Sequence, residues 1–168
     1  MGERLIVVEP KNLSYTGYFK LNELYYIIEK WLKEMGYDKK EKEHDVMVYP
    51  EGKTIFVRLI PDKSVSEFIK HVIEIKLHIS NLKDVTITVD GKQTAVQEGK
   101  INIMIRAIQE GDQENRFTQP FWYFMRLVID KYLFANFIND HTSILKDDVH
   151  MLYTEMSAYL NINKYRFK

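Results

Sequence analysis

Cysteine is absent from this chain of 168 residues. Its absence excludes disulfides, thiolate nucleophiles and cysteine-ligated zinc, and nothing in the chain points to an oxidising compartment. The first ten residues contain only four consecutive apolar positions, 5–8, which is too short a run for the core of a signal peptide. We therefore expect a cytoplasmic protein.

An excess of charge of one sign is also absent, because 24 Lys and Arg balance 24 Asp and Glu. Binding of nucleic acid through phosphate contacts requires a basic surface, so nucleic acid is not expected as the primary partner. A net charge of zero favours association over mutual repulsion. The hydrophobic share of 45% is that of an ordinary globular protein, and the length predicts a single domain over residues 1–168.

Signature motifs of catalysis are missing as well. The sequence has no glycine-rich phosphate loop, no Gly-x-Ser-x-Gly elbow and no EF-hand. Glu110, Asp112 and Glu114 place three carboxylates in one segment, for which a solvated loop is a better interpretation than a calcium site. We expect no metal and no cofactor. The chain favours a protein without enzymatic activity, although catalytic groups distant in sequence leave an enzyme open.

The longest apolar run covers residues 121–138, in which only Arg126, Asp130, Lys131 and Asn136 are strongly polar. As a helix, this run is apolar nearly all round and must be covered on more than one face. A sheet, another helix, a second subunit, a lipid or a bilayer would each provide such a cover. A transmembrane span is not expected, because each charge at the middle costs roughly 2.5–3.5 kcal/mol on insertion scales.

Hydrophobic periodicity predicts the remaining elements. Extended pieces are expected at 5–8 and 15–19, followed by a helix over 21–35 with Asn22 as its N-cap and Gly36 as its stop. Residues 38–45 are interpreted as a charged loop. A further helix is expected to begin near Thr142, and its apolar stripe is expected to cover one side of the 121–138 helix.

Between residues 46 and 109 the hydrophobic period changes to two, which is typical of antiparallel strands. Pro50-Glu51-Gly52-Lys53 and Asp90-Gly91 predict hairpin turns, and another turn is expected at 98–100. The predicted fold is therefore α+β. An antiparallel meander of about six or seven strands wraps on the long apolar C-terminal helix, with one N-terminal helix and one extra C-terminal helix.

This order of elements resembles the helix-grip (START-like) fold over roughly residues 5–138. The resemblance implies a curved sheet around a long helix, often with an apolar cavity between them. Members of that class bind lipids, sterols, polyketides or other apolar ligands, and some are cyclases or partner-binding modules. The extra helix from Thr142 departs from the minimal pattern and would fill a cavity if it closed the grip. The chain also resembles small uncharacterised archaeal proteins in its turns and its C-terminal helix pair.

The candidate ligand-binding residues are those that would line such a cavity. His71 shares strand parity with Ile73 and Ile75, so its side chain is expected to face the core or a cavity. For Arg106 the outer face is the preferred position, although within a cavity its charge would suit an anionic ligand head. The full set is His71, Ile73, Ile75, Leu77, Ile103, Ile105 and Arg106 on the sheet, with Phe121, Phe124, Met125, Val128 and Tyr132 on the helix.

Two functions remain open at this point. The first is a non-catalytic binding module that holds an apolar or amphipathic small molecule between the sheet and the long helix. The alternative is a protein–protein or ribonucleoprotein-associated interaction factor, homo-oligomeric, with a filled core and no ligand. A cyclase or hydrolase that uses His71 or Arg106 ranks lowest, because no base has a partner identifiable from spacing.

Overall fold

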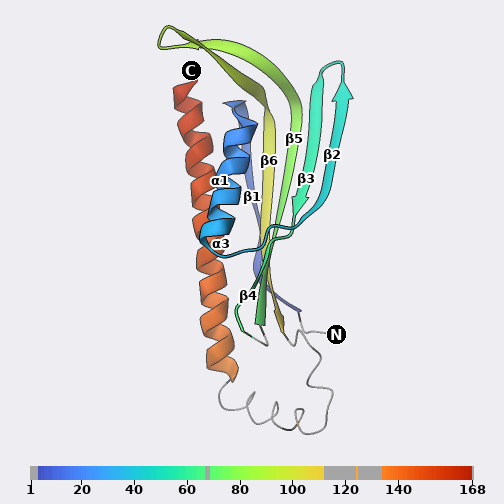
Figure 1. Cartoon of the computed structure of the whole chain (residues 1–168), viewed down its shortest axis with the longest axis vertical. Helices are drawn as coiled ribbons and strands as arrows, with labels where there is room; N and C mark the ends of the chain where they lie inside the picture. Colours follow the sequence, from blue (N-terminus) through green and yellow to red (C-terminus); the bar gives the residue numbers. More distant parts are fainter. Residues whose placement is uncertain (1–3, 67–68, 112–123, 125–133, 168) are drawn as a thin grey trace.

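The computed structural model describes residues 4–66, 69–111, 124 and 134–167. It confirms an α+β fold with an antiparallel sheet; the described residues form six strands and two helices (Figure 1). The elements are β1 Arg4–Phe19, α1 Leu21–Glu34, β2 Glu41–Tyr49, β3 Gly52–Leu59, β4 Asp62–Ser64, β5 Ile69–Val89, β6 Lys92–Gly111 and α3 Phe134–Arg166.

The strand order is β1-β6-β5-β3-β2, and the short β4 pairs with one end of β5. Hairpin turns connect β2 to β3 and β5 to β6, as Tyr49 pairs with Gly52 and Val89 with Lys92. Both helices lie on one face of the sheet, and the distal part of the β5–β6 hairpin curls over their ends (Figure 1). The β2–β3 hairpin lies on the side of the sheet away from α3.

Helix α1 is amphipathic, and its buried face includes Leu24, Ile28 and Trp31. Gly36 ends the helical segment with a φ of 74°, a conformation that glycine adopts without a steric penalty. The N-cap position is Lys20, in extended conformation and without a side-chain cap. The prediction of Asn22 as the N-cap is therefore wrong by two residues, and Asn22 lies inside the helix.

Helix α3 is continuous from Phe134 to Arg166, so the prediction of a helix that begins near Thr142 is wrong. The chain has no proline or glycine between these two residues, and nothing local interrupts the helix. Residues 134–138, the C-terminal end of the apolar run, form the first turn of α3 and the start of its second. The rest of the predicted 121–138 helix, except Phe124, lies outside the described residues.

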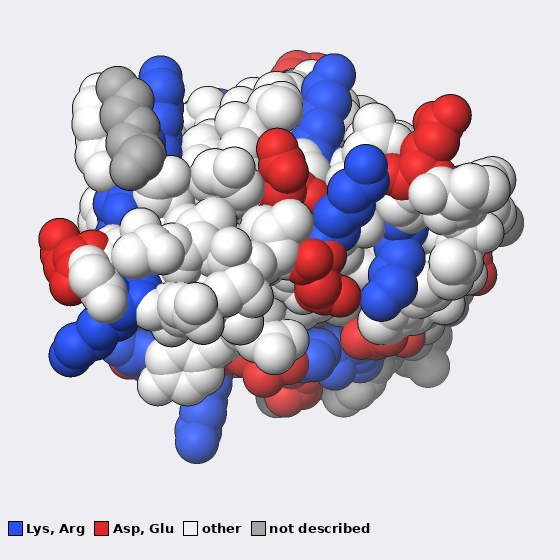
Figure 2. Space-filling view, turned by 90° about the horizontal axis from the view of Figure 1, so that it is seen from above, with Lys and Arg blue, Asp and Glu red and all other residues white. Residues whose placement is uncertain are grey.

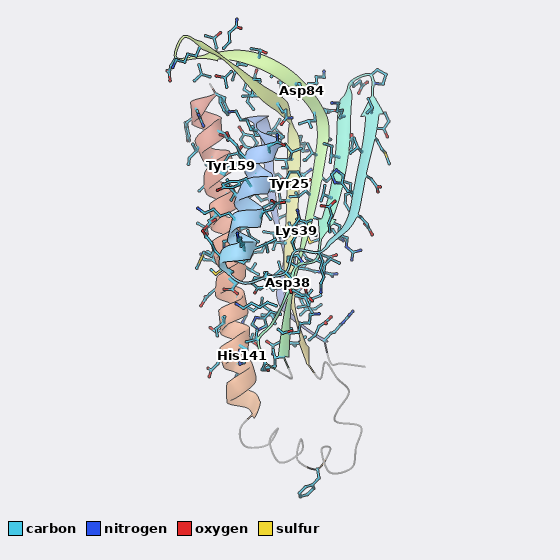
Figure 3. All side chains as sticks on the ribbon, in the orientation of Figure 1. Tyr25, Asp38, Lys39, Asp84, His141 and Tyr159 are labelled. Carbon is cyan, nitrogen blue, oxygen red and sulfur yellow. The ribbon has the colours of Figure 1, made fainter. Side chains whose placement is uncertain are left out.

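The buried stripe of α3 packs toward the sheet and α1. Its members Leu145, Val149, Leu152, Met156 and Leu160 are all at most 1% exposed and belong to the same core cluster as the strands. Tyr159 links α3 to the start of α1, because its hydroxyl donates to the Lys20 carbonyl oxygen over 2.9 Å (Figure 3). Among the described helices, none combines the length and the hydropathy that a membrane crossing needs.

Two local predictions about the strands are wrong, and a third, of two separate extended pieces near the N-terminus, is confirmed in type but not in extent. Residues 98–100 lie within β6, where Gly99 packs against the β5 bulge; a Cβ on it would lie 3.1 Å from the Ser80 carbonyl oxygen. The pieces at 5–8 and 15–19 belong to one strand, β1, with register shifts between Ile6 and Lys11. Most of the expected charged loop is strand, because β2 begins at Glu41.

Candidate functional site

The described sheet residues that were expected to line a cavity are buried against the helices. Ile73, Ile75, Leu77, Ile103 and Ile105 are all at most 1% exposed. They form one cluster with the buried faces of α1 and α3. None of the four surface hollows considered below is lined by any of them. In the described part of the chain, these residues act as core.

His71 points into this interior, where the side chain is fully buried. Its ring centroid lies 6.1 Å from that of His141 on α3, at the end of the sheet that contains β4 (Figure 3). Within the described residues, neither ring nitrogen of His71 has a hydrogen-bond partner. Burial is the main cause that lowers the pKa of His71 to about 4, and electrostatic interactions with His141 and Lys63 act in the same direction. The imidazole is therefore neutral at pH 7.

Arg106 lies on the opposite face and pairs with Glu74. Arg58 donates from Nε to the Glu74 Oε1 over 2.7 Å, and the Glu74 side chain is only 3% exposed. Burial opposes ionisation of Glu74, but the hydrogen bond from Arg58 and the charges of Arg106 and Lys76 outweigh it and lower its pKa. Arg106 is thus committed to an ion-pair cluster on the outer face, away from the core.

Of the candidates in the predicted 121–138 helix, only Phe124 is among the described residues. Phe124 is 62% exposed. Phe121, Met125, Val128 and Tyr132 lie outside the described residues, as do Asp112 and Glu114 of the predicted carboxylate loop.

A different feature, the β2 edge, was not identified as a site from the sequence. Strand β2 stands at the end of the strand order and pairs with β3 alone among the described strands. Val46, Met47, Val48 and Tyr49 are 51%, 53%, 73% and 53% exposed. Successive side chains point to opposite faces, so apolar surface is open to solvent on both sides of this edge. The signal in the sequence was a run of four apolar residues directly before Pro50.

The open backbone edge adds to this apolar surface. A strand at the edge of a sheet presents a row of N–H and C=O groups that another strand can pair with, and natural proteins usually block such edges. The other edge strand, β1, has such a block: it has register shifts at Ile6–Val8 and Val8–Lys11, and Pro10 lies within the second. Strand β2 has a register shift only between Glu41 and Glu43 and pairs regularly from there to Tyr49.

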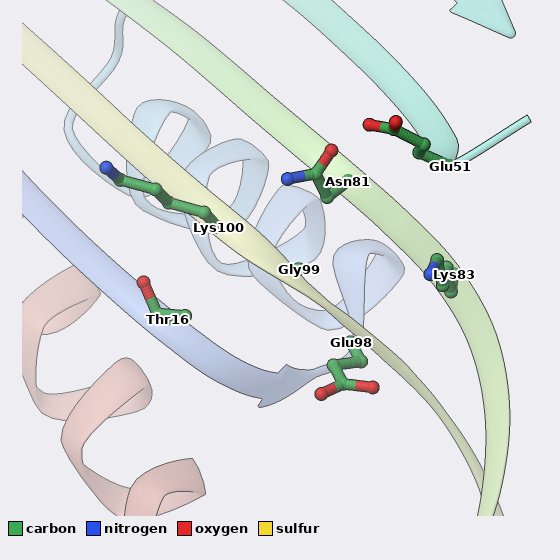
Figure 4. A pocket seen from close by; sticks show the side chains of 7 residues that line it. All are labelled: Thr16, Glu51, Asn81, Lys83, Glu98, Gly99 and Lys100. Carbon is green, nitrogen blue, oxygen red and sulfur yellow. The ribbon is translucent and has the colours of Figure 1, made fainter. Parts of the chain in front are cut away.

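The outer face of the sheet carries a hollow of about 540 Å³ where β5 bulges (Figure 4). Asn81, at the bulge, has a φ of 54°. Lys83 and Lys100 balance Glu51 and Glu98 around the rim, so the hollow has no dominant charge. Its lining is Thr16, Glu51, Asn81, Lys83, Glu98, Gly99 and Lys100.

Two further hollows lie along the β5–β6 hairpin. One of about 290 Å³ is lined by Val85, Val96 and residues at the start of α1, and one of about 470 Å³ lies between the hairpin tip and Tyr165, Arg166 and Phe167. Seen from this end, acidic and basic side chains are interspersed without a large area of one sign (Figure 2). A fourth hollow, on the exposed side of α1, is lined by Tyr26 and charged residues.

Among the described residues, no group of three or more His, Asp or Glu side chains is arranged to hold a metal ion. No protein-family model and no curated protein sequence matches this chain.

Proposed function

We propose that this chain is a non-catalytic protein-interaction module that binds an extended segment of a partner along the open edge of β2. The observation that carries this proposal is the stretch Val46–Tyr49, in which every side chain is at least half exposed although all four are apolar. Strand addition uses backbone hydrogen bonds for affinity and alternate side chains for specificity. Both are available at this edge.

The filled interior supports an interaction factor over a ligand carrier. Ile75, Leu77 and Leu152 are fully buried in one cluster, which leaves the face between sheet and helices to the chain's own side chains. Exposed apolar side chains also occur along α3, but β2 has four in succession, and the helices provide no cover there (Figure 1). Apolar side chains that remain open to water on both faces of a strand are the type of surface that partners cover.

Panning of a phage-displayed peptide library against the purified protein tests the proposal. We expect enrichment of short, extended, β-branched or aromatic peptides. Val48→Lys should weaken their binding at least tenfold, because lysine on an edge strand opposes the addition of another strand. Val48 is 73% exposed, so the substitution leaves the core intact.

Ile162→Lys is the matched control, since Ile162 is 61% exposed on α3, and the β2–β3 hairpin lies on the side of the sheet away from that helix (Figure 1). It introduces the same lysine at an equally exposed aliphatic position. Peptides that bind Val48→Lys as well as they bind the unchanged protein, or a library from which nothing is enriched, would count against the proposal.

A second candidate is the binding of an amphipathic small molecule, for which the hollow of about 470 Å³ between the β5–β6 hairpin and α3 is the supporting observation. Its volume is within the range of small-molecule sites, about 300–1,000 Å³. Val89 and Phe167 supply apolar contact there, and Lys92 and Arg166 supply positive charge. The helix-grip resemblance is consistent with a ligand between sheet and long helix. Native mass spectrometry that finds only the mass of the chain would argue against this candidate.

A further inference from the structure

The apolar end of β2 has a symmetric sequence. Val46-Met47-Val48 reads the same in both directions, with Met47 at its centre. In an antiparallel pair of identical strands related by a two-fold axis, residues at equal distances from the axis face each other, so an axis at Met47 sets valine against valine on both sides of the centre. We infer that the segment that pairs with β2 is the β2 strand of a second copy of this chain, an inference that rests on the proposed function of this edge.

The charges of β2 exclude most registers of such a pair. A register centred on Glu43 or Asp45 sets a carboxylate directly opposite its own copy, and one centred on His44 sets Glu43 opposite the second copy's Asp45. Like charges directly across a strand pair are destabilising. A register centred on Val46 sets Asp45 against the second copy's Met47, which leaves a charge beside an apolar side chain.

The register centred on Met47 avoids these conflicts. Val46 then faces the second copy's Val48 on one face, and Met47 faces its own copy on the other. Asp45 faces Tyr49, whose hydroxyl lies at the polar rim. Glu43 and His44 extend past the second copy's Tyr49, the last residue of its β2, so within the paired strands no carboxylate faces another; Glu43 comes level with Glu51 of the second copy's hairpin turn. A net charge of zero adds no long-range repulsion between the copies.

Strand β1 is the other open edge of the sheet, and its structure opposes pairing with a second copy. Leu5 and Ile6 are 48% and 51% exposed, but the strand is irregular directly after them. Pro10 lacks a backbone N–H, and the register shifts that end at Lys11 bend the edge. The β2 edge is regular over Glu43–Tyr49, which gives the second copy a longer template.

Single cysteines test the register, because the chain contains none. In the Met47 register, the two Cα atoms of Met47→Cys lie about 4.5–5.5 Å apart. This separation is within the usual range of a disulfide, about 4.4–6.8 Å. In Val48→Cys the two Cα atoms lie about 8 Å apart, from a rise of roughly 3.4 Å per residue on each strand, which is too far for a disulfide.

Mild oxidation should therefore convert most of Met47→Cys to a covalent dimer and leave most of Val48→Cys monomeric on a non-reducing gel. A mixture of Val46→Cys and Val48→Cys chains should form the mixed dimer, because these two positions face each other. Sedimentation equilibrium should show that the unchanged chain dimerises and that Val48→Lys weakens dimerisation at least tenfold, with Ile162→Lys as the control.

The outcomes separate this inference from the proposed function. If the chain stays monomeric at high concentration and Met47→Cys forms no cross-link, the inference that a second copy pairs with β2 is wrong. If the selected peptides still bind in a Val48-dependent manner, the edge retains its proposed function with a different partner. Cross-linking that is faster at Asp45→Cys than at Met47→Cys overturns the register. Loss of both peptide binding and dimerisation contradicts the proposed function itself.

Discussion

At the scale of single residues, β5 accommodates two buried polar side chains in different ways. Glu74 remains charged on the outer face, because arginine and lysine side chains surround it. His71, on the inner face, has an aromatic neighbour in His141 and a positive charge nearby in Lys63, and it stays neutral. Burial of an unpaired imidazole is tolerated only in its neutral form. His71 is therefore the residue at which acid should act on the fold.

We predict that the free energy of unfolding falls as the pH drops from 6.5 toward 4. In this window the unfolded chain binds a proton at His71, whereas the folded chain, with a pKa of about 4, does not. The stability contribution is thus complete above the unfolded pKa of 6.5 and is lost as the pH falls. The difference between the two pKa values corresponds to about 3 kcal/mol. Urea unfolding at pH 7.5, 6, 5 and 4 measures it.

His71→Leu provides the comparison, since it removes the titrating group and keeps a large buried side chain. Carboxylates with lowered pKa values, such as Glu74 and Asp62, also contribute to acid sensitivity, and they do so equally in both chains. The stability of His71→Leu should therefore decline less than that of the unchanged chain over this window. Parallel stability curves for the two proteins would contradict the prediction.

At the scale of elements, α3 has the role that the sequence assigned to the 121–138 helix. The sheet face that would enclose a ligand instead packs against Leu145, Val149 and Leu152 of α3. The contribution of this buried stripe to stability can be measured directly.

We predict that Leu152→Ala lowers the free energy of unfolding by about 2–5 kcal/mol, the usual cost of a large-to-small substitution in a packed core. Leu152 is fully buried in the cluster shared with the sheet. Ile162→Ala on the same helix, at a position 61% exposed, should change stability by less than about 0.5 kcal/mol. Chemical denaturation of both variants is the measurement. Similar small losses would indicate a loose interior with space for a ligand.

The alternation of residues 46–109 was enough to predict an antiparallel sheet and the turns at Pro50 and Asp90-Gly91, because side-chain period and turn chemistry are local properties. The turn expected at 98–100 failed for a tertiary reason. The backbone of the β5 bulge packs so closely against Gly99 that the position has no room for a side chain. This contact joins positions distant in sequence. The sequence predicts a boundary near Thr142 because an apolar run changes there to an amphipathic stripe, but such a change in pattern does not interrupt the backbone of a helix.

The candidate site was less accessible from the sequence. Residues 46–49 were recognised as a strand, but their exposure depends on the order β1-β6-β5-β3-β2, in which β2 has one neighbour among the described strands. Strand order arises from pairings between distant segments, and a single sequence does not encode it in any local pattern. For the same reason, the partnership between Glu74 and Arg106 emerges only from the register of β5 with β6.

At the scale of the whole molecule, one core joins both helices to the sheet. Trp31 of α1, Ile75 of β5 and Leu152 of α3 belong to the same buried cluster, and Trp31 stacks on Tyr37 with 5.6 Å between the ring centroids. Tyr37 in turn donates a hydrogen bond of 2.8 Å to Asp148 of α3. Segments at both ends of the chain thus depend on the same contacts, which is the arrangement expected of a single cooperative unit.

We therefore predict one unfolding transition for the chain. In a Val48→Lys, Trp122→Phe background, which removes the edge pairing and leaves Trp31 as the only tryptophan, Trp31 fluorescence and far-ultraviolet circular dichroism should report the same urea midpoint. Without Val48→Lys, a dimer would make that midpoint rise with protein concentration, because association stabilises the folded state by mass action. Two separate midpoints in the monomeric background would mean that α1 unfolds independently of the sheet, and the single domain over residues 1–168 would have to be divided.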